Sequence, residues 1–175
     1  MPLGSIPEPE DEADAQTRDV YALFGLAYYM SQVLEHTLVN LITLAQLTRP
    51  HTVPAGVTTQ DELWSRAFKL TLGNLVRQLP TDFYDTSVVA SKLSAAVDTR
   101  NDLAHRFFRE RAESFLTARG RAAMVVYLED AREQFSEAET MLTTIYRFHG
   151  RKVGITEEAI QREYERVKHE AGTDI

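Results

Sequence analysis

The chain has 175 residues, enough for one domain with a sizeable core, and it contains no cysteine. The lack of cysteine excludes disulfides and Cys-based metal or redox sites. The formal net charge is −7, and five acids among the first fourteen residues supply most of it, which leaves the rest near −2. We therefore expect no broad basic field of the kind that attracts nucleic acid over a whole surface.

The apolar runs of the sequence are too short to cross a membrane, because Glu35, His36 and Asn40 interrupt the longest of them. The first residues lack the basic and apolar segments of a secretory signal. From these two features we expect a cytoplasmic protein without a membrane partner.

Residues 1–14 combine three prolines with five acids, which predicts a disordered acidic leader. The remainder, residues 15–175, is predicted to form a single helical domain. Apolar residues recur at three- and four-residue spacing over 16–48, which is typical of a long amphipathic helix. Glu35 lies inside this apolar stripe, where a buried carboxylate needs a partner. Either Glu35 orients a basic group of a functional site, or it pairs with a structural arginine or lies at the surface.

Proline and glycine in residues 49–57 predict a loop. Thr59 and Glu62 form a capping box that opens a second helix, which we expect to continue to about Arg77. Trp64 on that helix is expected in the core rather than on a base-stacking surface.

The second half of the chain continues the helical pattern. A third helix is predicted from residue 86 to about 109 and a fourth over 121–149, with an undetermined turn or short helix between them. A charged last helix over 156–171 is expected to dock on the bundle or on a partner chain. Together the elements predict an all-α, up-and-down bundle of four to five helices.

Arg100, Asn101 and His105 lie within the third predicted helix and form the candidate site. Asn101 and His105 are four residues apart and therefore share one helix face. Arg100 and His105 are five apart, which on a regular helix separates them by roughly 140° around the axis and about 7.5 Å along it. A local distortion, or a second copy of the chain across a symmetric interface, would bring these two side chains together.

An Arg-Asn pair followed four residues later by His, on a helix of a small helical protein, resembles the motif of the HEPN superfamily. The resemblance covers roughly residues 15–150 and implies the HEPN bundle of four to five helices. Many HEPN proteins are metal-independent endoribonucleases, and they usually dimerise so that two motifs face one cleft. The resemblance therefore implies a toxin or defence ribonuclease without cofactor or metal, with Arg100 and His105 as catalytic residues.

The chemistry implied by the resemblance suits these residue types. An imidazole such as that of His105 can transfer protons near neutral pH, and the Arg100 guanidinium can give two hydrogen bonds to phosphate oxygens. Two protomers would supply one histidine as base and one as acid, and the products would carry a 2′,3′-cyclic phosphate and a 5′-hydroxyl. Asn101, Glu35 and Asp102 are the expected supporting residues.

Six arginines lie between residues 100 and 121, which makes this the one locally basic region of the chain. We expect Arg106 and Arg109 to contact the RNA backbone. The alternative is that these two arginines only form ion pairs, with Asp102 and Glu113 as their partners.

Two further considerations bear on partners. HEPN toxins that are silenced by a partner nucleotidyltransferase carry a Tyr two residues after the His, whereas this chain has Phe107, so adenylylation at that position is not available. A protein regulator or antitoxin of another type stays among the expected partners, beside RNA and a second copy. The alternative to an enzyme is a non-catalytic HEPN-like scaffold or interaction module, which the charged last helix would suit.

Overall fold

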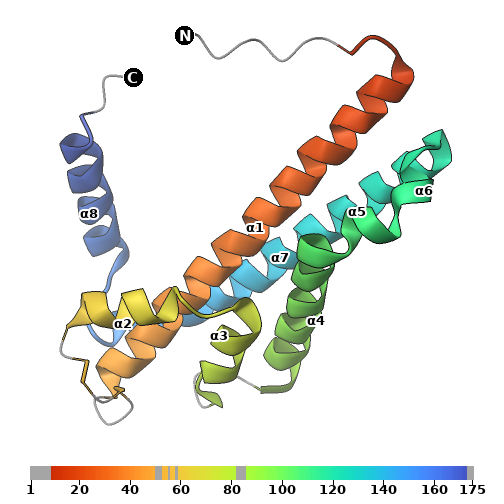
Figure 1. The fold of residues 1–175 in the computed structure, drawn as a ribbon. Coiled ribbons are helices and arrows are strands. Elements are labelled where there is room, and N and C mark those ends of the chain that lie inside the picture. Colours follow the sequence, from red (N-terminus) through yellow and green to blue (C-terminus); the bar gives the residue numbers. More distant parts are fainter. Residues whose placement is uncertain (1–8, 50–52, 55, 58, 82–85, 173–175) are drawn as a thin grey trace. The chain divides into compact units, whose positions relative to one another are not determined.

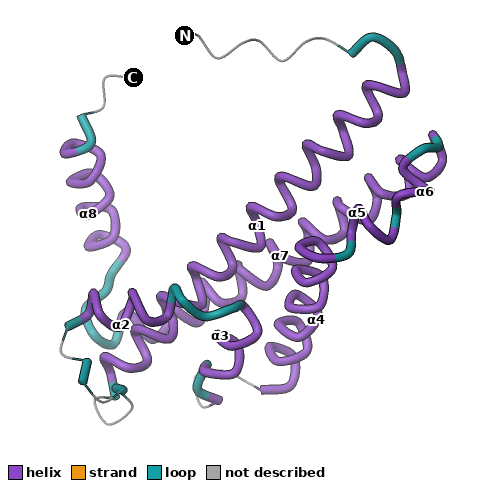
Figure 2. The backbone as a smooth tube through the Cα atoms, in the orientation of Figure 1, coloured by secondary structure: helices purple, strands orange, loops and turns teal. Residues whose placement is uncertain are grey.

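The computed structural model describes residues 9–49, 53, 54, 56, 57, 59–81 and 86–172 (Figure 1). Within these ranges every regular element is a helix and no strand occurs (Figure 2). The predicted all-α class is therefore confirmed. The two longest helices, α1 (Glu12–Thr48) and α7 (Ala118–Arg151), pack together in a helical bundle.

Helices α1 and α7 run in the same direction. Near their N-terminal ends, Arg121 Nε donates to Gln16 Oε1 at 3.1 Å, and further along Thr37 Oγ1 donates to Glu139 Oε1 at 3.4 Å. Two parallel neighbours need a crossover between the end of one and the start of the other. The segment from α2 to α6 supplies this connection, and it carries the candidate site.

Helix α4 (Thr86–His105) runs in the opposite direction to α7. Lys92 of α4 forms an ion pair with Glu137 of α7 at 2.5 Å. Ten residues further along α4, Asp102 accepts a hydrogen bond from Tyr127 of α7. Because the α4 numbers rise while the α7 numbers fall, the two helices are antiparallel.

The chain divides into two compact units, Met1–Leu34 with Ala90–Ala138, and Glu35–Val89 with Glu139–Ile175. Because α1, α4 and α7 each contribute residues to both units, the predicted single domain over 15–175 stays a prediction. Arg100, Asn101 and His105 belong to the first unit, whereas Glu35 begins the second.

The first unit has an apolar core in which each long helix contributes residues at helical spacing, as an amphipathic pattern requires. Its buried side chains include Val20, Ala27, Leu34, Leu93, Ala96, Leu103, Phe107, Met124, Leu128, Phe135 and Ala138.

The second unit contains the predicted second helix, which is in fact two helices. Helix α2 (Gln60–Ala67) opens with the predicted Thr59 capping box, but α3 (Leu72–Gln78) is separate. Thr71 has an extended backbone with ψ 158°, which ends the helical path between them. The break lets both short helices bury leucines, and Trp64, expected in the core, is 41% exposed, so that prediction is wrong.

The third predicted helix, expected to reach residue 109, ends at His105. Two single-turn helices follow, α5 (Phe107–Glu110) and α6 (Ala112–Phe115), and α7 then begins three residues earlier than predicted. The backbone leaves helical geometry at Arg106, where φ is −127° and ψ is −29°.

The ends of the chain differ from prediction mainly in their boundaries. Helix α1 begins at Glu12, four residues earlier than predicted, and residues 1–8 of the predicted leader lie outside the described residues. Residues 50–52 and 55 of the predicted loop over 49–57 also lie outside them. Helix α8 (Glu157–Glu170) begins as expected after Thr156, whose side chain accepts a hydrogen bond from the Ala159 amide.

Candidate functional site

Arg100, Asn101 and His105 lie in the last turns of α4, and His105 is the final residue of that helix. Asn101 and His105 are exposed, whereas Arg100 is half-buried. The Arg106 amide still donates to the Asp102 carbonyl at 2.9 Å, so the helical hydrogen-bond pattern continues past His105. The motif therefore sits on regular helix, and the distortion of the backbone comes only after it.

The Arg100 side chain bends toward Asn101. Its Nη1 atom donates to Asn101 Oδ1 at 3.5 Å, which is a long, exposed contact. The guanidinium thus contacts Asn101, which lies one turn before His105 on the same helix face. Since no distortion falls between Arg100 and His105, the turn of about 140° between them persists within one chain.

Asp102 is the most heavily bonded side chain of this region. It is 8% exposed, and its carboxylate accepts the Tyr127 hydroxyl at 2.8 Å. The same carboxylate pairs with Arg111 Nη1 at 3.1 Å and Arg106 Nε at 3.3 Å. Asp102 thus joins α4, the turn after α5 and α7 through one carboxylate, and we name Asp102, Arg106, Arg111 and Tyr127 the Asp102 cluster.

The Arg111 guanidinium also stacks on aromatic rings. Its central carbon lies 4.4 Å from the centre of the Tyr127 ring and 4.8 Å from that of Phe107, and Nη1 donates to the Phe107 carbonyl at 3.4 Å. Its side chain is 25% exposed, so these cation–π contacts are partly shielded from water. Arg111 therefore holds the fold together at this point rather than facing solvent.

The Asp102 cluster shifts the titration of Tyr127. Burial, the hydrogen bond to Asp102 and the negative charge of that carboxylate together raise the pKa of Tyr127 to about 12, against the opposing charges of Arg111 and Arg106. At neutral pH the hydroxyl is consequently protonated and acts as a donor to Asp102.

Aromatic packing fixes α5 directly after the motif. Phe107 is buried, with its ring centre 5.5 Å from that of Phe24 on α1, and Phe108 lies 4.9 Å from Phe24 and 5.6 Å from Tyr21. These contacts hold the two phenylalanines against α1, so the position of the chain just after His105 is set by packing.

A close approach of two backbones closes the turn between α6 and α7. A Cβ atom at Gly120 would lie 1.9 Å from the Ser114 carbonyl oxygen, so only glycine fits there. The next residue, Arg121, is 8% exposed and donates Nη1 to the Phe115 carbonyl at 3.1 Å. Gly120 itself lies in the first turn of α7.

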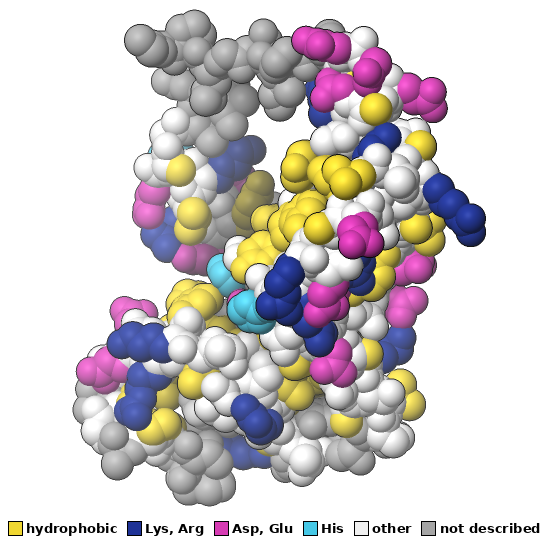
Figure 3. Space-filling view, turned by 45° about the vertical axis from the view of Figure 1, so that its right-hand side comes forward, with side chains coloured by type: hydrophobic (Ala, Val, Ile, Leu, Met, Phe, Trp, Pro, Cys, Tyr) yellow, Lys and Arg dark blue, Asp and Glu magenta, His cyan; other side chains and the backbone are white. Residues whose placement is uncertain are grey.

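Several of the six arginines are thus committed to structure. Arg106 is predicted to bind RNA, with an ion pair to Asp102 as the alternative. The structure shows this ion pair, and the Arg106 side chain is 48% exposed. Arg109 is 73% exposed and contacts Glu110 at 3.5 Å, not Glu113. The face drawn in Figure 3 shows basic and acidic side chains interspersed rather than one basic field, which agrees with the composition.

Glu35, the remaining predicted supporting residue, is half-buried on α1, and its Oε1 atom is shielded from solvent. Its predicted approach to Arg100 would join the two compact units and stays a prediction.

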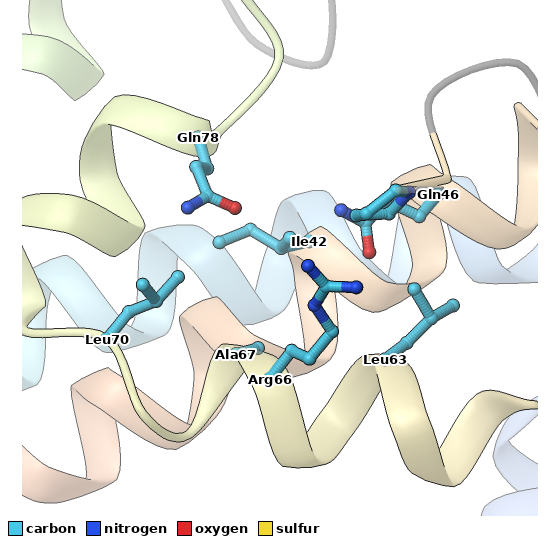
Figure 4. Close-up of a pocket in the computed structure, with 8 residues that line it drawn as sticks. Ile42, Gln46, Leu63, Arg66, Ala67, Leu70 and Gln78 are labelled. Atoms are coloured by element: carbon cyan, nitrogen blue, oxygen red, sulfur yellow. The ribbon is translucent and has the colours of Figure 1, made fainter. Parts of the chain in front are cut away.

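A small cavity of about 180 Å³ lies elsewhere, in the second unit (Figure 4). Arg66 of α2 points its guanidinium into it, near Ile42 and Gln46 of α1, and Gln78 of α3 lies on the far side. Substrate pockets usually enclose about 300–1,000 Å³, so this cavity is too small for a nucleotide.

The described part of the chain contains no group of three or more His, Asp or Glu residues arranged to hold a metal ion. None of its helices is long and apolar enough to cross a membrane.

Comparison with known proteins adds no relative, because no family model, no curated protein and no solved structure matches the chain. The resemblance to HEPN proteins therefore stays an expectation from the sequence motif of Arg100, Asn101 and His105.

Proposed function

We propose that the protein is a metal-independent endoribonuclease of the HEPN type, which cleaves RNA with Arg100 and His105 in the cleft of a homodimer. One observation supports this most strongly. The Arg100 guanidinium contacts the Asn101 amide one turn before His105, on the regular end of α4, where Asn101 and His105 are exposed. The Asn101 amide and the His105 imidazole thus share one exposed helix face, and the Arg100 guanidinium contacts that amide.

The proposed reaction is an internal transesterification. One imidazole removes the proton of the ribose 2′-hydroxyl, whose oxygen attacks phosphorus, and a second imidazole protonates the departing 5′-oxygen. The P–O5′ bond breaks as the P–O2′ bond forms, which leaves a 2′,3′-cyclic phosphate and a 5′-hydroxyl. Arg100 stabilises the charge of the crowded phosphorane with its planar, permanently charged guanidinium.

The geometry of one chain supports the proposed dimer. Only one His105 is present per chain, yet the reaction needs both a base and an acid. The turn of about 140° between Arg100 and His105 also persists, because the backbone distortion comes at Arg106. A second α4 facing the first supplies the missing imidazole, as in an up-and-down HEPN bundle that dimerises through its motifs.

Of the two arginines proposed to contact RNA, Arg109 is more exposed than Arg106. Arg109 is the better candidate, because Arg106 is shared with Asp102. Binding through so few phosphate contacts weakens with salt only shallowly, since each contact contributes roughly 0.7 to the slope for a single strand.

The test incubates the wild type with tRNA or total RNA in EDTA and compares two histidine variants. His105→Ala is expected to lose about a hundred- to ten-thousand-fold in rate, the usual contribution of general acid–base catalysis. His169→Ala, which removes an exposed histidine on α8, is the matched control and should cleave at the wild-type rate. Asn101→Ala should be milder than His105→Ala, because Asn101 only orients its neighbours.

A second candidate function is a non-catalytic scaffold or interaction module. The observation in its favour is the apolar side of α8, where Ile160, Tyr164 and Val167 are exposed. Wild-type protein that leaves every RNA intact while binding a protein partner tightly would favour this function over the nuclease.

A further inference from the structure

Helix α8 leaves an apolar side uncovered. Ile160 is 40% exposed, Tyr164 60% and Val167 51%, although the remainder of the helix is strongly charged. With Ile155 and Ala159 these side chains line a shallow apolar hollow on the second unit. A helix with one apolar and one charged side is normally stabilised by packing its apolar side against another element.

The spacing of the exposed residues is that of a coiled-coil seam. Ile160, Tyr164 and Val167 are separated by four and then three residues, and Ala171 follows after another four. A three–four alternation occupies the a and d positions of a heptad, with Ile160 and Val167 at d and Tyr164 and Ala171 at a. Such a seam fits a second helix with the same pattern.

The flanking charges favour one orientation of two such helices. In this register Glu163 is at g and Lys168 at e, so a parallel pair places Glu163 of each copy beside Lys168 of the other. An antiparallel pair would instead place Glu163 beside Glu170 of the second copy, and like charges would repel. The charges of α8 therefore complement a second α8 only in the parallel arrangement.

Contacts within α8 keep Glu163 charged and stabilise the helix. Arg166 holds the pKa of Glu163 below its usual range through a side-chain hydrogen bond, so Glu163 is negatively charged at neutral pH. Arg166 pairs with Glu170 as well, at 2.6 Å, and such pairs within a helix stabilise it. The Thr156 cap adds to this at the first turn.

We propose that α8 pairs with α8 of a second copy of this chain as a short parallel coiled coil, with Ile160, Tyr164 and Val167 in its seam. A parallel pair has its two-fold axis along the helices, so it is compatible with a closed symmetric dimer. The paired stretch is only about 21 Å long, so association through α8 is weak and depends on protein concentration. The proposal does not depend on the nuclease activity.

The first test measures self-association of the full chain by sedimentation over 1–200 micromolar, on the order of the range where small interfaces dissociate. The seam variant Ile160→Ser/Val167→Ser should raise the dissociation constant at least about tenfold. The matched control Arg162→Ser/His169→Ser carries the same number of serines at the two f positions, on the other side of α8, and should stay close to the wild type.

Charge reversal then tests the orientation. Glu163→Lys or Lys168→Glu alone should weaken association, and the double variant should restore it, because the cross-pairs are re-formed. Circular dichroism on each variant checks that α8 stays helical. Strengthening by Glu163→Lys alone would overturn the parallel arrangement, since that change favours the antiparallel one.

Other occupants of the apolar side give different results, and each overturns the proposal. A wild type that stays monomeric at the highest concentration would leave the surface to another protein. A seam variant that melts earlier but associates as before would mean that the chain's own body covers the surface. Because no variant alters Arg100 or His105, RNA cleavage by the same proteins is read separately.

Discussion

Replacing Asp102 by asparagine should destabilise the fold more than any other single change of a charged side chain near the motif. The carboxylate is 8% exposed and serves three donors, two of them arginines. Breaking a fully buried ion pair costs about 3–5 kcal/mol, but Arg106 and Arg111 are partly exposed, at 48% and 25%. Since water can replace part of what they lose, we expect Asp102→Asn to lower the free energy of unfolding by about 2–3 kcal/mol.

The assay is urea unfolding followed by circular dichroism, with the slope of the transition compared between variants to confirm that only stability has changed. Glu137→Gln is the matched control, because Glu137 pairs with Lys92 at 2.5 Å but both side chains are about half exposed. Such a pair contributes no more than about 1 kcal/mol. Equal losses for the two variants, or a more stable Asp102→Asn protein, would refute the view that Asp102 anchors this region.

The remaining predictions concern Tyr127, two glycines and Arg100. Ultraviolet titration should show one tyrosine that ionises near pH 12, and this transition should be absent from Tyr127→Phe. Because the pKa in the folded state lies above the ordinary value near 10, the hydroxyl stabilises the fold fully below about pH 10. That contribution to the free energy of unfolding is lost as the pH rises through 12. Urea unfolding should show that Gly120→Ala lowers the free energy of unfolding by about 1–3 kcal/mol, because the new Cβ would meet the Ser114 carbonyl oxygen at 1.9 Å. The control Gly25→Ala has open space around the new atom, so its free energy of unfolding should stay unchanged or rise by up to about 1 kcal/mol. Arg100→Lys keeps the charge but loses the planar guanidinium, so the rate of RNA cleavage should fall strongly while the unfolding midpoint stays unchanged.

The features that were predicted correctly are those encoded by neighbouring residues. The all-α class and the long helices follow from apolar residues at helical spacing, and Thr59 and Thr156 mark the starts of α2 and α8 through their own caps. Asn101 and His105 could likewise be assigned to one face of α4, since that relation needs only a regular helix.

The end of α4 at His105 could not be predicted, because it depends on contacts far apart in the sequence. Asp102 is bonded to Arg111, nine residues away across the break, and to Tyr127, 25 residues away on α7. An i, i+4 charge pattern on one helix explains Arg106 but gives no sign of Arg111 or Tyr127. From the sequence Asp102 is expected to support the reaction or to pair with Arg106, and the structure adds Arg111 and Tyr127 as partners.

The division of the second predicted helix has a similar cause. Residues 60–77 contain leucines at spacings that one continuous helix could accommodate. Thr71 adopts an extended backbone instead, so that Leu63 on α2 and Leu75 on α3 are both buried. Gly73, the residue of lowest helix propensity in this stretch, lies inside α3 and does not mark the break.

The proposed cleavage of RNA by Arg100 and His105 through transesterification is tested most directly by the chemistry of the new RNA ends. Wild-type protein in EDTA should produce 2′,3′-cyclic phosphate and 5′-hydroxyl ends, detectable by mass spectrometry of a short labelled RNA. His105→Ala, with an unchanged unfolding midpoint, should produce them about a hundred- to ten-thousand-fold more slowly. Ends bearing a 5′-phosphate, full cleavage by His105→Ala, or activity that EDTA abolishes and magnesium restores would contradict the claim.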